Sequence, residues 1–111
     1  MTKFPKPKPW RNASYRAWIR THLCGICNDL GVSPWRRLPV EAAHVATGGT
    51  GTKASDYWCV PLCMTHHKEL HASGIETFQR TYDVHLTEVA EDLAEDSPWC
   101  DEIREWRSDH E

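Results

Sequence analysis

The spacing of cysteine and histidine most restricts what this 111-residue chain can fold into. Residues 59–71 read CVPLCMTHHKELH, which puts two cysteines and three histidines in one short run. Histidine is only intermediate in burial and each ring nitrogen needs a partner, so such a run is not an ordinary core segment. Cys24 and Cys27 form a C-x2-C pair, and Cys63 and His66 form a C-x2-H pair. Together they supply the four ligands of a closed structural zinc site, and thiolates favour zinc over magnesium.

The remaining cysteines are predicted to lie outside this set. Cys59 competes for a ligand place, but its C-x3-C spacing to Cys63 is looser than that of a zinc knuckle, and we expect it in the core. Cys100 stands alone in an acidic segment and is expected to be free. The alternative to zinc binding is that the cysteines of this set are simply small buried residues. The chain has no apolar stretch near the ~18 residues of a membrane span and no signal peptide, so we expect a cytoplasmic protein with reduced thiols and no membrane partner.

Helix geometry separates the histidines of the run. Successive residues on a helix differ in direction by ~100°, so His66 and His67 cannot both serve one tetrahedral site. His71 lies four residues after His67 and shares its face, where the two could bind a second metal ion or a phosphate beside Lys68. His44 ends a predicted strand, where it is either a general base near neutral pH or a hydrogen-bonded core histidine.

The pattern of the whole chain predicts a small α+β domain. The glycine-rich segment 46–56 fails the P-loop pattern and is expected to be a loop. Asn12 is a predicted N-cap, and residues 24–31 are predicted to form a tight turn. Strands are expected over 37–45 and 57–63, and helices over 13–22, 64–73, 75–84, 86–96 and 99–110.

Charge divides the chain into three segments. Residues 1–90 hold 11 basic and 7 acidic side chains, whereas residues 91–111 hold 2 basic and 9 acidic ones. Residues 1–11 are predicted to form a basic, proline-rich arm that either contacts phosphates or is a solvated terminus. Residues 12–86 form the zinc-stabilised domain, and residues 87–111 form an acidic helical extension. That extension docks on a partner, covers the basic surface or is a solvated helix.

The order of these motifs resembles the HNH nuclease superfamily, whose fold is the ββα-metal finger. YRAWIRTHLCGIC, EAAHV, SDYWCVPLC and HHKELHASGIETFQRTYDVHL are similar to small phage and prophage HNH proteins related to the Ref recombination nuclease. The resemblance implies a zinc knuckle flanked by an N-terminal helix and C-terminal helices. It also implies His44 as general base and His67 and His71 on a catalytic Mg2+, Mn2+ or other divalent ion. Asp56, close to the departing position Trp58, is our own candidate for a replacement ligand or for the group that orients His44.

The resemblance further implies a DNA endonuclease or nickase for phage or prophage DNA processing. Its partners would be double-stranded or single-stranded DNA and a phage recombination or packaging protein. Two departures from the pattern, Ala43 before the base and Trp58 at the family's middle Asn, leave the alternative of a non-catalytic, zinc-stabilised DNA- or protein-binding module. The residues expected to contact DNA are Lys6, Lys8, Arg11, Arg16, Arg20, Lys53 and Lys68.

Overall fold

The centre of the molecule is an antiparallel pair of strands followed directly by a helix. The computed structural model describes residues 9–29, 39–45 and 54–110. Strand β1 (Val40–His44) pairs with β2 (Cys59–Cys63), in a register that sets Val40 opposite Cys63 and His44 opposite Cys59. Helix α3 (Met64–Ser73) starts at the residue after β2. The predicted α+β class is therefore confirmed.

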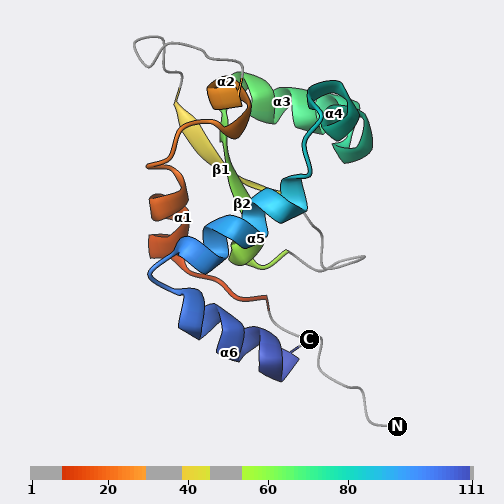
Figure 1. Ribbon diagram of the computed structural model, residues 1–111. Coiled ribbons are helices and arrows are strands. Elements are labelled where there is room, and N and C mark those ends of the chain that lie inside the picture. Colours follow the sequence, from red (N-terminus) through yellow and green to blue (C-terminus); the bar gives the residue numbers. More distant parts are fainter. Residues whose placement is uncertain (1–8, 30–38, 46–53, 111) are drawn as a thin grey trace, which may run out of the picture.

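The other elements surround this hairpin and helix. They are α1 (Ala13–Ile19), α2 (Gly25–Asp29), the 3-10 helix η2 (Asp56–Trp58), α4 (Ile75–Tyr82), α5 (Leu86–Asp96) and α6 (Cys100–His110). Helices α2, α3 and α4 gather at one end of the hairpin, α5 crosses it, and α6 lies beyond α5 (Figure 1). Within the described ranges, no helix is both long and apolar enough to cross a membrane.

Local chemistry explains where the elements begin and end. Helix α3 has the predicted bounds, and Gly74 ends it with a φ of 83°, which glycine adopts without a Cβ clash. Helix α4 ends two residues before the predicted end because Asp83 adopts a left-handed φ of 50°. Helix α1 is three residues shorter than predicted, and the side chains of Thr21 and His22 bond the Trp18 carbonyl oxygen just beyond it.

The expected turn around the first cysteine pair contains a short helix instead. Residues 25–29 form α2, and the Cys27 backbone N–H points at Cys24 Sγ at 3.5 Å. The Cys24 sulfur thus acts as the N-cap acceptor for a backbone N–H group of the first turn, which has no partner within the helix. The short length of α2 also explains why helical periodicity could not reveal it.

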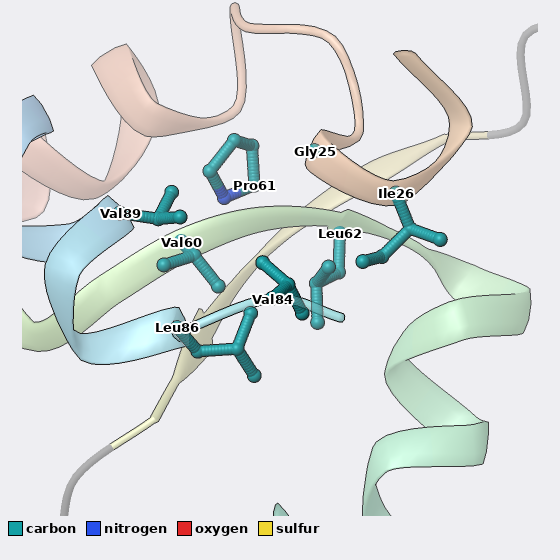
Figure 2. A pocket seen from close by; sticks show the side chains of 8 residues that line it. All are labelled: Gly25, Ile26, Val60, Pro61, Leu62, Val84, Leu86 and Val89. Atoms are coloured by element: carbon teal, nitrogen blue, oxygen red, sulfur yellow. The ribbon is translucent and has the colours of Figure 1, made fainter. Parts of the chain in front are cut away.

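Each face of the hairpin carries its own hydrophobic cluster. Strand alternation sends Ala43, Val60 and Leu62 to one face, where they pack with residues of α4 and α5 such as Phe78 and Ala90. This cluster includes a hollow of about 180 Å³ between α2, β2 and α5, lined by apolar side chains and Gly25 (Figure 2). Among the residues that the structure describes, no titratable side chain lines that hollow, so we do not place the predicted chemistry there.

The opposite face holds an aromatic cluster that ties both ends of the chain to the hairpin. Cys59 packs there with Trp10, Tyr15, Tyr57 and Ile103. The segment from residue 9 and helices α5 and α6 therefore share the core of the hairpin. Trp10 and Ile103 lie outside the predicted domain of residues 12–86 and belong to this second cluster, and the predicted division at residues 11 and 86 stays a prediction.

Candidate functional site

Cys24, Cys27, Cys63 and His66 converge on one point. Their ligand atoms all lie within 4.8 Å of one another. Cys27 Sγ is 3.8 Å from Cys63 Sγ, and His66 Nδ1 is 3.5, 3.5 and 3.2 Å from the sulfurs of Cys24, Cys27 and Cys63. A tetrahedral zinc ion, with Zn–S of ~2.3 Å and Zn–N of ~2.0–2.1 Å, would hold its sulfurs about 3.8 Å apart and each sulfur about 3.5 Å from nitrogen. The four side chains therefore fit a closed structural zinc site.

The backbone prepares this cluster for a cation. Burial alone raises the pKa of Cys24, but backbone N–H groups of Cys27, Cys63 and Ile26 outweigh it and lower that pKa below the ordinary thiol value. Burial, with the sulfurs of Cys24 and Cys63, raises the pKa of Cys27 to about 12. Three thiols this close cannot all ionise without a positive charge between them, and a zinc ion supplies that charge.

Tyr82 supports the imidazole of this cluster and was not found from the sequence. Its ring meets His66 edge to face, with ring centroids 5.4 Å apart. Its hydroxyl donates to the Glu69 carboxylate, and this bond, more than burial, raises the pKa of Tyr82 to about 12. Helix α4 thus holds the α3 histidine in place. The only sequence signal would have been an aromatic residue at the end of the helix after the knuckle.

His67 faces away from this cluster and joins a second set. Its Nδ1 lies 3.0 Å from Oε1 of Glu41 on β1, and its Nε2 lies 3.1 Å from Nε2 of His71. The His67 side chain is 22% exposed and that of Glu41 48% exposed, so solvent reaches the group. His66 and His67 thus face different groups of side chains, as helix geometry predicted, and the roles assigned to the two residues stay predictions. Glu41 was missed as a member, although strand alternation puts it on the face opposite that of His44.

His44 belongs to a third set, built around a buried carboxylate. Its Nε2 is 2.9 Å from Oδ1 of Asp56, whose side chain is fully buried while His44 remains 33% exposed. The other oxygen of Asp56 accepts from Arg16 and, at 2.7 Å, from the backbone N–H of Asn12. Arg11 Nε is 3.8 Å from Oδ1. Since a buried carboxylate is tolerated only when it is paired, the N-terminal segment completes the pocket that holds His44.

The structure does not bring all the predicted catalytic residues together. Asp56 contacts His44, and no contact of the described residues joins it to His67 or His71. This placement is compatible with the orienting role considered for Asp56, which stays a prediction. Glu41 and His44 lie three positions apart on β1, so their Cα atoms are about 10 Å apart and their side chains leave opposite faces.

Cys59 adjoins the third set as a packed thiol, as the sequence predicted. It lies within 4.8 Å of His44 and Asp56 and has no solvent exposure. Burial, and then the Asp56 carboxylate, raise the pKa of Cys59 to about 12, so its thiol stays neutral. Cys100 is half-buried and unpaired by a disulfide.

The predicted DNA-contacting side chains divide into three groups. Arg11 and Arg16 are engaged by Asp56, although Arg11 is 44% exposed. Arg20 and Lys68 are exposed, and Lys68 follows His67 on α3. The positions that lie outside the described residues are Lys6, Lys8 and Lys53.

Comparisons with known proteins give one family and one curated relative. Residues 1–97 match the family DUF968, described as a protein of unknown function. The chain is also 33% identical over 88 residues to the uncharacterized protein YdfU of Escherichia coli K12, a match that covers 76% of this chain and 22% of the relative. This chain thus spans about a fifth of the length of YdfU. No solved structure matches. The chain belongs to the DUF968 family.

Proposed function

We propose that this chain is a metal-dependent DNA endonuclease or nickase of the HNH type, built on a structural zinc site. The observation that supports this most is the set of fixed imidazoles on one hairpin and helix. A buried carboxylate holds His44, while His67 and His71 present converging nitrogens from α3. The cluster of Cys24, Cys27, Cys63 and His66 would hold zinc and lock the start of α3 to the end of β2.

His44 would act as the general base. A carboxylate only accepts hydrogen bonds, so Nε2 of His44 carries the hydrogen that it donates to Asp56. In the neutral ring the free lone pair is then on Nδ1, which can take a proton from an attacking water. Arg16 supplies a positive charge beside Asp56, so the buried carboxylate does not depend on a charged imidazole for compensation.

His67 and His71 would hold the catalytic divalent ion. Such an ion, when bound, polarises the phosphoryl oxygens and stabilises the leaving oxygen. The two histidines lie one turn apart on one face of α3, and His67 contacts the β1 residue Glu41. Because His44 lies three positions further along β1 and leaves its opposite face, the substrate would be a phosphodiester that crosses the edge of this strand. Exposed Lys68 and Arg20 would contact the flanking phosphates, which position a nucleic acid without reading its sequence.

The setting of this reaction follows the resemblance. Phage or prophage DNA processing or recombination is the process that we propose, with DNA as the substrate and a recombination or packaging protein as partner. A cytoplasmic location would follow from this role.

A nicking assay tests the proposal. Supercoiled plasmid and single-stranded DNA are incubated with zinc-loaded protein and Mn2+ or Mg2+, beside His44→Ala and the control His85→Ala, which alters the exposed N-cap histidine of α5, whose side chain makes no capping hydrogen bond. We expect metal-dependent nicking in wild type and control. General base catalysis accelerates a reaction roughly 10²–10⁴-fold, so the nicking rate of His44→Ala should fall at least roughly 10²-fold. Equal rates in wild type and His44→Ala would contradict the role of His44.

One observation favours a second function. His44 shares no described contact with His67 or His71, and a zinc-stabilised module that binds DNA or protein needs no such contact. Binding of DNA, measured by fluorescence anisotropy, without nicking in any divalent metal would support the module and reject the enzyme.

A further inference from the structure

Glu41, His67 and His71 form a chain of contacts from β1 to α3 in which each link fixes the next. Glu41 Oε1 is 3.0 Å from His67 Nδ1, and His67 Nε2 is 3.1 Å from His71 Nε2. The two imidazole rings are 4.8 Å apart and tilted by 38°. Their spacing of four residues puts both rings on one face of α3, so the helix makes them neighbours. The contact from Glu41 on β1 orients the His67 ring.

Hydrogen-bond chemistry assigns the hydrogens along this chain. The Glu41 carboxylate accepts, so His67 Nδ1 must donate to it. A neutral imidazole has one N–H, which leaves a lone pair on His67 Nε2. That lone pair faces His71 Nε2, which donates to it when no ion is bound. When a cation binds instead, His71 carries its one hydrogen on Nδ1, and the lone pairs of both Nε2 atoms face the gap between the two rings.

The separation of the two nitrogens suits one ion. Metal–nitrogen bonds of ~2.0–2.1 Å, at angles between octahedral and tetrahedral, hold two imidazole nitrogens about 2.9–3.4 Å apart. The observed 3.1 Å lies inside that range. A carboxylate on the far nitrogen of a metal-binding histidine is a common support, because it fixes the tautomer and makes the ligand more basic.

We propose that Glu41 is a positioning residue of a two-imidazole centre, formed by His67 and His71, that selects a first-row transition ion over Mg2+. This deepens the proposed function, because it concerns the same histidines and names the class of ion. Imidazole suits zinc, nickel and iron, whereas Mg2+ prefers oxygen ligands and keeps its waters. Glu41 serves the centre through His67 and leaves the remaining positions of the ion open to water and substrate.

The test measures metal binding apart from DNA cleavage. Untagged protein is first loaded with one equivalent of zinc, so that the cysteine cluster is filled, and is then titrated with Ni2+ and with Mg2+ by calorimetry. We expect one Ni2+ site that His67→Ala and His71→Ala remove, with far weaker Mg2+ binding. Loss of an outer carboxylate typically lowers metal affinity roughly 10–100-fold, and we expect that loss in Glu41→Leu.

Two variants separate positioning from charge. Glu41→Gln keeps an oxygen that accepts from His67 Nδ1, so it should retain more of the Ni2+ affinity than Glu41→Leu. Glu105→Leu removes an exposed carboxylate from α6 and should bind as wild type does. Long-range 1H–15N spectra should show His67 with its hydrogen on Nδ1 in the wild type and a mixture of tautomers in Glu41→Leu.

Each result points to one conclusion. Equal Ni2+ affinity in wild type and Glu41→Leu, or a His67 hydrogen on Nε2, overturns the role of Glu41 even if the protein nicks DNA. Absence of a Ni2+ site, or Mg2+ binding as tight as Ni2+, overturns the choice of ion. Nickel binding that depends on Glu41 in a protein that never nicks DNA upholds this inference and rejects the proposed function.

Discussion

Two neighbouring histidines on α3, His66 and His67, belong to sites of opposite character. His66 completes a half-buried set of four ligands whose mutual distances match a tetrahedral ion. His67 pairs with His71 in an open, solvent-reached group that has two nitrogens and one supporting carboxylate. Structural zinc sites are closed, and catalytic metal sites keep open positions. A turn of ~100° between consecutive residues is enough for one helix to carry both.

The difference also appears in what supports each set. Backbone N–H groups and Tyr82 surround the cysteine cluster, so the fold fixes the positions of its ligands. An ion bound by these ligands would in turn stabilise the fold. The open group rests on a single side-chain bond from β1, and its loss should leave the fold intact. We therefore predict that a change at His66 affects stability, whereas a change at the adjacent His67 affects chemistry and leaves stability intact.

The largest expected effect comes from replacing each of these two histidines. His66→Ala removes a zinc ligand, and structural zinc in small domains contributes an apparent ~10–16 kcal/mol at pH 7, so we expect zinc loss and unfolding of the hairpin and α3. His67→Ala should keep one equivalent of zinc and a wild-type melting curve. Elemental analysis and circular dichroism measure both.

Cys100→Ser serves as the control for cysteine content, since that residue lies on α6 outside the cluster. A His66→Ala protein that is folded and holds zinc, or a His67→Ala protein that loses it, would reverse the comparison.

A smaller effect is expected at the buried carboxylate that holds the third imidazole. Asp56→Asn removes the negative charge that lies between His44 and Arg16. Each hydrogen bond to a charged group contributes about 1.5–3 kcal/mol to the free energy of unfolding. We expect unfolding free energy to fall by about 2 kcal/mol, with zinc content unchanged. Any nicking activity should fall up to roughly 10²-fold, because His44 loses the acceptor that sets its tautomer.

Asp83→Asn is the matched control, because Asp83 is exposed at a left-handed position that Asn tolerates equally well. Chemical denaturation and plasmid nicking are the measurements. If Asp56→Asn were as stable and as active as Asp83→Asn, the pair of Asp56 and His44 would have no part in the site.

Sequence spacing was sufficient for the closed site and for α3, but not for the open one. The C-x2-C and C-x2-H pairs identify their ligands because each pair lies on one tight local segment. Glu41 reaches His67 across 26 positions, and strand alternation gives only the face on which it lies. Its partner depends on how α3 packs against β1, which the spacing does not determine.

The setting of His44 illustrates the same limit. Asp56 lies close to His44 in the sequence and was predicted as a possible partner of it. Two of its other contacts, Arg16 and the Asn12 backbone, come from 40 and 44 positions away. The density of basic residues predicted Arg16 as a DNA contact. It carries no information on the buried Asp56 carboxylate with which Arg16 forms an ion pair.

The smallest expected effect distinguishes Cys59 from the ligand Cys63, four residues later. Because Cys59 has its pKa raised to about 12 by burial and Asp56, the folded protein keeps a proton that the unfolded chain loses above its ordinary pKa of 9.0. Its contribution to stability is complete below about pH 9 and is lost as the pH rises towards 12. Between pH 8 and pH 10, zinc-loaded wild type should lose about 1 kcal/mol more than Cys59→Ala in urea unfolding. Equal losses in the two proteins would mean that Cys59, the first cysteine of β2, ionises freely in the folded protein and is not set apart from the ligand Cys63 at the end of the same strand.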